Sequence, residues 1–212
     1  MRMIYRNLFS ILALAALLPL SAASFKTEVG PAPVEAIPEA TKAMIASEAV
    51  SVKSGDKVIA QFWMRTAPFE GDPVAGFGVR YDALPEGAFI GVVNFTEAGS
   101  DFREQSIPSG VYTLRYGLHP ENGDHMGVAA SRDFAVLSPV DKDLDVAKNY
   151  EFEAMMDLTF EIGNPHPTVA RLELPEGDEA PHLWEDDYEH WVLDLKVADE
   201  VMGIVVYGHS EE

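Results

Sequence analysis

The chain has 212 residues, of which 47% are hydrophobic, and this is enough apolar material for a folded domain with a sizeable core. Its 35 Asp and Glu outnumber its 15 Lys and Arg, so the formal net charge is −20 at pH 7. That balance argues against nucleic acid and anionic membrane surfaces as partners, because both are bound through clustered cations. The absence of cysteine excludes disulfides, thiol nucleophiles, Cys-based zinc sites and a lipid-anchoring lipobox.

Residues 1–23 have the layout of a secretory signal peptide. A basic start with Arg2 and Arg6 precedes an uncharged apolar run, and small residues close the segment at Ala23. The run is shorter than the roughly 20 residues that cross a bilayer. We therefore predict cleavage after Ala23, no membrane span after processing, and a location in the bacterial periplasm or the medium. A retained anchor helix or a buried core helix is the alternative.

The segment that follows, 24–38, is predicted to be an extended arm, because it carries three prolines that disfavour regular structure. The last of them, Pro38, suits the first turn of a short helix over about 39–48. The remaining chain, 49–212, is predicted to form one β-sandwich domain, since its length fits a single domain.

A β-hairpin is predicted at the start of this domain. Residues 49–52 and 57–64 are rich in β-branched and aromatic side chains, and Ser-Gly-Asp at 54–56 forms the turn between them. Residues 67–87 are rich in Pro and Gly and are predicted to be mostly loop, with a short strand at 77–81 as an option.

The clearest strand pattern lies in the middle of the chain. Residues 89–95 form a strand candidate, and 111–118 alternate so that the even-numbered side chains, two Tyr and two Leu, share one face. Residues 132–137 are predicted to return as a strand after a polar surface loop at 119–126. Tyr112, Tyr116 and Trp63 are most simply interpreted as core residues.

The segment 150–162 fits two structures. Its even positions are all apolar, which favours a strand, but its apolar side chains also form a helical stripe. Beyond it, residues 168–174, 190–197 and 201–207 are predicted strands, separated by an acidic loop and a short turn. Many short strands with Pro- and Gly-rich turns predict a mainly β fold, an antiparallel sandwich or jelly roll with one or two short helices.

Four short motifs lie between 110 and 167. They are Gly-Val-Tyr-Thr-Leu-Arg-Tyr-Gly-Leu at 110–118, Asp-His-Met-Gly at 124–127, Arg-Asp-Phe at 132–134 and Asn-Pro-His-Pro at 164–167. Together they resemble an uncharacterised group of exported bacterial β-sandwich proteins, over about residues 49–174. The resemblance implies a small β-sandwich with a helix before the His-Pro element, and so favours a helix at 151–161. It implies no activity.

All six histidines lie in the second half of the chain, and two of them share one predicted loop with acids. His119, Asp124 and His125, with His166 from the His-Pro element, are candidate ligands for a divalent metal, since imidazole and carboxylate suit zinc, manganese or iron. The spacing matches no established metal motif, and the loop also reads as an ordinary turn.

Two further groups are candidate ligand-binding residues. Arg115 and Asp133 lie on predicted neighbouring strands, where they would form an ion pair, or Arg115 would bind an anion in a cleft. Trp184, Asp186, Tyr188 and Trp191 combine aromatic rings with carboxylates, a combination that binds sugars or holds calcium. A solvated acidic loop beside two core aromatics is the plainer interpretation.

The sequence indicates an exported, non-catalytic binding or envelope-associated protein whose ligand is unknown, with a protein or a carbohydrate as candidate partner. The alternative is a metal-dependent enzyme of jelly-roll, cupin-like type that uses the His and Asp cluster. The chain contains no nucleophile elbow, P-loop or dinucleotide-binding motif that would identify a reaction.

Overall fold

The computed structural model describes residues 25–101, 103–120 and 131–208. Within them, ten strands form one antiparallel sheet in the order β1-β2-β3-β4-β7-β8-β9-β12-β11-β10, and β5 and β6 form a separate pair. The predicted mainly β, antiparallel class is confirmed, and the sandwich is nearly closed into a barrel. The elements are β1 Phe25–Val29, α1 Glu39–Lys42, β2 Val50–Ser54, β3 Lys57–Met64, β4 Phe89–Phe95, β5 Gly99–Ser100, β6 Ser106–Ile107, β7 Gly110–Leu118, β8 Asp133–Pro139, α2 Phe152–Phe160, β9 Val169–Glu173, β10 His182–Glu185, β11 Trp191–Val197 and β12 Glu200–Tyr207.

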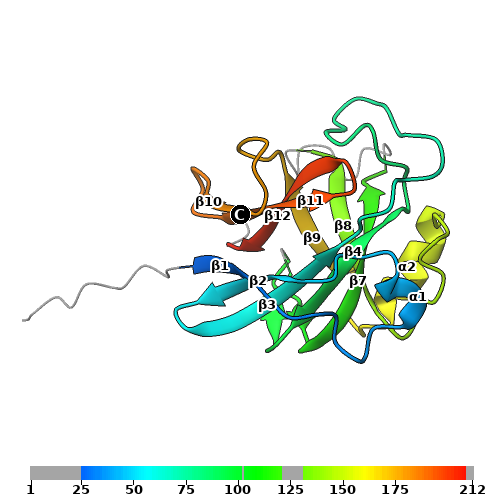
Figure 1. Ribbon diagram of the computed structural model, residues 1–212. Coiled ribbons are helices and arrows are strands. Elements are labelled where there is room, and N and C mark those ends of the chain that lie inside the picture. The colour runs from blue at the N-terminus through cyan, green and yellow to red at the C-terminus, as the bar shows by residue number, and fades with distance from the viewer. Residues whose placement is uncertain (1–24, 102, 121–130, 209–212) are drawn as a thin grey trace, which may run out of the picture.

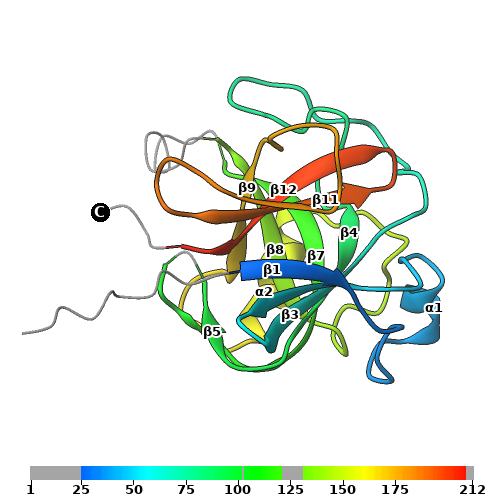
Figure 2. The same cartoon turned by 60° about the vertical axis from the view of Figure 1, so that its left-hand side comes forward.

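The sheet curls until its two ends meet. β11 and β12 cross over β1, β2 and β3, and both described helices lie outside the barrel (Figure 1). β1 approaches β10 without pairing with it. Across this seam the Phe25 ring packs against Trp191 and Tyr207, with ring centroids 5.4 Å and 4.7 Å apart. Figure 2 shows β1 (blue) at this seam, facing the orange and red strands from the other end of the sheet. Aromatic contacts therefore close the barrel where backbone hydrogen bonds do not.

The main core lies inside the barrel and follows the predicted alternation of β7. The two Tyr and two Leu at its even positions all belong to this core. The opposite face of β7 is also buried, because the loop after β8 covers it, and Arg115 on that face is fully buried. Trp63 is fully buried in a second cluster behind β3, where its indole N–H donates to the Pro31 carbonyl at 3.0 Å. The core assignments of Trp63, Tyr112 and Tyr116 are thus confirmed.

The arm before the domain differs from its prediction. Residues 25–29 are not a free arm but form β1, paired with β2 from Phe25 opposite Ser54 to Val29 opposite Val50. This strand ends before the first proline, so every residue in it keeps the N–H that a sheet requires. The helix predicted over 39–48 is only four residues long, because Ala46 donates instead to the Met64 carbonyl and Ile45 bridges to Arg65.

The ambiguous segment 150–162 is helical, as the family resemblance implied and against the strand pattern. α2 packs on the outer face of β8, where Met155 is fully buried against Phe134 and Val136. The optional strand at 77–81 does not form, because the N–H groups of Arg80 and Tyr81 donate to the Asp133 carboxylate instead of to a neighbouring strand.

Candidate functional site

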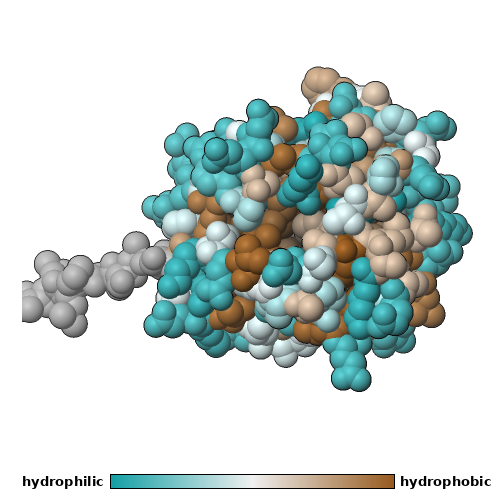
Figure 3. Space-filling view, in the orientation of Figure 1, coloured by the Kyte–Doolittle hydropathy of each residue, from teal (hydrophilic) through white to brown (hydrophobic). Residues whose placement is uncertain are grey.

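A cavity of about 460 Å³ lies inside the barrel, within the range typical of small-molecule pockets. Strands from both crossing halves of the sheet line it. The lining is mainly apolar and comprises Phe25, Ser54, Ile59, Ala60, Phe62, Val93, Phe95, Glu97, Ala98, Gly99, Ser100, Asp101, Ile107, Leu114, Leu137, Val169, Ala170, Arg171, His190, Ile204, Val205, Val206, Tyr207 and Gly208. On the face shown in Figure 3, hydrophobic residues gather between the two halves of the fold.

The cavity has a buried floor and an exposed rim. Leu114, Leu137 and Ile204, which form part of its floor, are each only 1% exposed. The rim comes from the loop after β4, at 97–100, and from the end of β12 at Tyr207, which is 44% exposed. A ligand could therefore enter at the rim and bury an apolar body against the floor.

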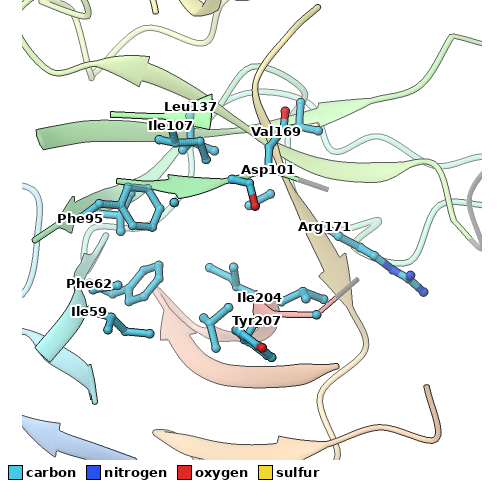
Figure 4. A pocket seen from close by; sticks show the side chains of 18 of the residues that line it. Ile59, Phe62, Phe95, Asp101, Ile107, Leu137, Val169, Arg171, Ile204 and Tyr207 are labelled. Atoms are coloured by element: carbon cyan, nitrogen blue, oxygen red, sulfur yellow. The ribbon is translucent and has the colours of Figure 1, made fainter. Parts of the chain in front are cut away.

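Aromatic rings form one wall. Phe62 on β3 and Phe95 on β4 point into the same space from neighbouring strands, and Ile204 and Tyr207 on β12 face them (Figure 4). Ile107 and Leu137 close another side. Period-two alternation accounts for Phe62, Phe95 and Ile204, and the β-bulge between β11 and β12 at Trp191/Val192 lets Tyr207 share the face of Ile204.

The ionisable side chains of the lining have partners in the protein. Glu97 forms an ion pair with Lys57, and Arg171 donates from Nε and Nη2 to Oε1 of Glu173. His190 is 2% exposed, and its Nδ1 lies 2.9 Å from Oδ2 of Asp186. The Glu97 and His190 contacts hold the loop after β4 and the β10–β11 turn in place, and the Arg171 contact lies within β9.

Asp101 also lines the cavity and is 8% exposed. Its Oδ1 accepts the backbone N–H groups of Arg103 and Gln105, both at 2.9 Å, and its Oδ2 accepts from the Gln105 side chain at 2.6 Å. Within the part of the chain that the structure describes, no cationic side chain forms an ion pair with this carboxylate. Its charge is balanced by hydrogen bonds alone.

Arg115, a candidate ligand-binding residue, is inside the fold. Its guanidinium forms a bidentate ion pair with Asp143, with both N–O distances 2.7 Å, and lies 3.9 Å from the ring centroid of Tyr150. Its three other N–H bonds go to the carbonyl oxygens of Gly87, Lys148 and Asp145. All five donors of the guanidinium are therefore used within the protein.

The ion pair expected between Arg115 and Asp133 is not formed. Asp133 instead accepts hydrogen bonds from the hydroxyl of Tyr116 and from the backbone of Arg80 and Tyr81. The two side chains belong to opposite faces of the sheet, since Arg115 points outward on β7 and Tyr116 points into the core. Asp133 therefore fixes the long loop before β4 to the sheet.

The second candidate group, Trp184, Asp186, Tyr188 and Trp191, does not gather on one face. Trp191 packs into the main core with Leu183, so Trp184, the neighbour of Leu183 on β10, lies on the other side of the sheet. Tyr188 is 65% exposed at the turn between β10 and β11. The contacts thus place the two indoles apart, and the sugar-binding hypothesis stays a prediction.

Asp186 organises the turn that joins β10 to β11. Its Oδ1 accepts the backbone N–H groups of Tyr188 and His190 at 2.9 Å and 2.8 Å. Burial opposes ionisation of this carboxyl, but the hydrogen bonds from His190 and Tyr188 outweigh it, so the pKa of Asp186 is lowered. The group is an ionised turn residue that also holds the His190 ring at the cavity.

Two of the four metal-ligand candidates, Asp124 and His125, lie outside the described residues. The His119 ring packs on Phe134 with centroids 4.6 Å apart, and His166 is exposed with its backbone N–H bonded to Oε1 of Gln105. Within 25–101, 103–120 and 131–208, no three His, Asp or Glu side chains come together in a way that could hold a metal ion. The metal site stays a prediction.

Comparison with protein-family models, with curated proteins and with solved structures finds no match for this chain. Among the described residues, neither helix has both the length and the apolar character that a membrane crossing requires. Function is therefore inferred from the geometry of the cavity itself.

A buried carboxylate on β11 offers a test of the electrostatics. Asp194 on β11 is fully buried, its Oδ2 accepts the Glu176 N–H at 3.1 Å, and its Oδ1 is unpartnered within the described residues. Burial raises its pKa, and the nearby Trp184 indole, the Glu176 N–H and His182 oppose that rise only in part. The ionised carboxylate therefore costs stability at neutral pH.

We expect Asp194→Asn to raise the Tm at pH 7. Because the folded-state pKa lies above the unfolded one, the folded protein binds the proton more tightly, and stability of the parent rises as pH falls through the folded-state pKa. The increase in Tm caused by Asp194→Asn should therefore become smaller toward pH 4. Thermal unfolding followed by circular dichroism at both pH values measures it, with the exposed Asp199→Asn as the charge-matched control. Equal shifts for the two variants would contradict the assignment.

Proposed function

We propose that the protein is an exported, non-catalytic binding protein that takes a small, mainly apolar molecule into the cavity of its barrel. The observation that carries this proposal is the apolar cavity of about 460 Å³ with a buried floor and an exposed rim. Closed and nearly closed β-barrels of modest size commonly enclose one small ligand in this way. The predicted leader at 1–23 supports a periplasmic or extracellular location.

The size of the cavity limits the ligand. At about 30 Å³ per water-sized atom, 460 Å³ holds a molecule on the order of 15 non-hydrogen atoms. The floor offers Leu, Ile and Val side chains, so most of the affinity would come from burial of apolar ligand surface. The ionisable groups of the lining already serve as partners for the rim and the turns, which fits binding better than chemistry.

Binding of a neutral apolar dye tests the proposal. N-phenyl-1-naphthylamine should bind the mature protein with increased fluorescence at a stoichiometry near one. Ala170→Trp should weaken this binding by about tenfold or more, because Ala170 lines the cavity and packs on its core, and the indole would occupy the dye's space. The matched control is Ala36→Trp, which adds the same ring at an exposed position remote from the lining.

Ala170→Leu fills less of the cavity and should weaken dye binding by an intermediate factor. It replaces Ala170→Trp in the dye-binding test if the Trp variant does not fold. Thermal unfolding of each variant shows whether the barrel is intact. No dye binding to the folded parent protein, or equal binding by all folded variants, would overturn the proposed function.

A further inference from the structure

Resting on the proposed function, we propose that the cavity selects an organic cation, a protonated amine or a quaternary ammonium group carried on an apolar body. Three features of the lining support this class of ligand: its aromatic walls, a carboxylate without a cationic partner, and cations that are already paired. Each is independent of the others.

The aromatic walls suit a cation. Phe62 and Phe95 face one space from adjacent strands (Figure 4). Phe25 and Tyr207, which also line the cavity, pack against each other at the seam. Ring faces carry negative electrostatic potential and attract ammonium groups, above all where water is excluded. Other proteins recognise quaternary ammonium groups with such aromatic rings. In this cavity the rings are already in place, so binding would need no change in the fold.

Asp101 supplies the negative charge. It is more than nine-tenths buried, and the hydrogen bonds from the backbone of Arg103 and Gln105 and from the Gln105 side chain fix its position. Oδ1 already accepts two hydrogen bonds, whereas Oδ2 accepts one and can accept a second. Since no ion pair to it occurs in the described part of the chain, an ammonium group entering the cavity would meet a carboxylate that is held by hydrogen bonds and has no cationic partner there.

Within the described residues, the cations at the cavity are already paired, so an anionic ligand would find no unpaired cation there. Arg171 is the cation of the lining, and both Nε and Nη2 donate to Glu173. Lys57 at the rim is paired with Glu97. The net charge of −20 adds a long-range field that attracts cations toward the mouth and repels carboxylates.

A series of three decyl compounds tests the inference by displacement of N-phenyl-1-naphthylamine at low salt. Decyltrimethylammonium, decanol and decanoate share one chain and differ in head-group charge. We expect the cation to bind about tenfold more tightly than the alcohol, the gain that a desolvated cation–π contact can give. Decanoate should bind least tightly.

Asp101→Asn should reduce the preference for the cation over the alcohol to about threefold or less, because it removes the charge and replaces the acceptor that faces the Gln105 amide by a donor. Asp199→Asn is the matched control, since it makes the same substitution at an exposed position outside the lining and should keep the preference. Phe95→Leu removes one ring without changing charge, and it gives a second readout of the same ratio if the Asn variant does not fold.

The outcomes separate the two proposals. If the dye binds but decanol or decanoate equals or exceeds decyltrimethylammonium, the cation preference is wrong and the binding function stands. If Asp101→Asn and Phe95→Leu both keep the parent preference, the cation is recognised elsewhere and the inference fails. If no dye binds, the proposed function fails first.

Discussion

Asp143→Ala is expected to destabilise the fold by about 3–5 kcal/mol, the cost typical of removing one partner from a buried ion pair. Asp143 and Arg115 are both fully buried, and their two N–O distances of 2.7 Å leave no room for water between them. Without Asp143, the Arg115 cation stays inside the protein with only backbone carbonyls and the Tyr150 ring around it. Desolvation of that unpaired charge is the physical reason for the loss.

Thermal and urea unfolding measure this effect. A Tm lower by about 6–20 °C is expected, taking about 2–4 °C per kcal/mol for a domain of this size. Arg115→Met should lower the free energy of unfolding by a similar amount. The double variant Asp143→Ala/Arg115→Met should lose much less stability than the sum of the two single losses. Lys142→Ala breaks the nearby exposed pair with Glu161 and should change stability by less than about 1 kcal/mol. An Asp143→Ala effect as small as this control would contradict the buried-pair argument.

The strands themselves could be predicted from local patterns, but their partners could not. Alternation places Arg115 on the face of β7 opposite Tyr116, and this is correct. It cannot say that the loop after β8 brings Asp143 onto that face, because the pairing depends on how a distant segment covers the sheet. Nearness along the sheet predicts Asp133 as the partner of Arg115, but Asp133 accepts a hydrogen bond from Tyr116 on the other face.

The weakest elements were missed for a related reason. β10 is only four residues long and lies in an acidic stretch, and it forms because the edge of β11 offers hydrogen bonds to it. β1 pairs at the opposite edge of the sheet in the same way. In α2 both periods fit the sequence, and the burial of Met155 against β8 decides for the helix. Sheet edges and helix docking are tertiary effects that short windows do not contain.

The cavity could not be predicted from the sequence pattern either. Inward-facing residues such as Phe62, Phe95 and Ile204 could be recognised as core by their alternation, yet the pattern does not show which inward residues leave a space between them. That space exists because the sheet curls and its halves cross, with Phe25 closing the seam. Asp101 gave no signal at all, since it lies between two short strands that were not predicted.

Gly87→Ala is expected to lower the free energy of unfolding by more than about 3 kcal/mol, because it combines backbone strain with a steric clash that the surrounding atoms cannot relieve. Gly87 has a φ of +76°, a left-handed conformation that favours glycine. A Cβ built there would lie 1.8 Å from the carbonyl oxygen and 2.6 Å from the nitrogen of Tyr150. Main-chain atoms, unlike a flexible side chain, cannot turn aside.

The clash could be relieved only if residues 148–150 moved away from Gly87, and the same segment contacts the guanidinium of Arg115. The carbonyls of Gly87 and Lys148 both accept hydrogen bonds from Nη1 of Arg115, and the Tyr150 ring lies over its guanidinium. Any shift that accommodates the methyl group therefore loosens the buried ion pair with Asp143. The collision and the electrostatic loss act on one cluster, so their costs are coupled rather than independent.

Gly55→Ala separates strain from collision. Gly55 has a φ of +60° in the β2–β3 turn, and a Cβ there would meet nothing within 4 Å. This variant should lose only about 1–2 kcal/mol, the cost of a left-handed residue with a side chain. Urea unfolding of both variants gives the difference, and soluble yield replaces it if the Gly87 variant does not fold. Equal losses of stability at the two positions would show that the Tyr150 backbone moves freely, and would contradict the claim that the cluster around Arg115 is rigid.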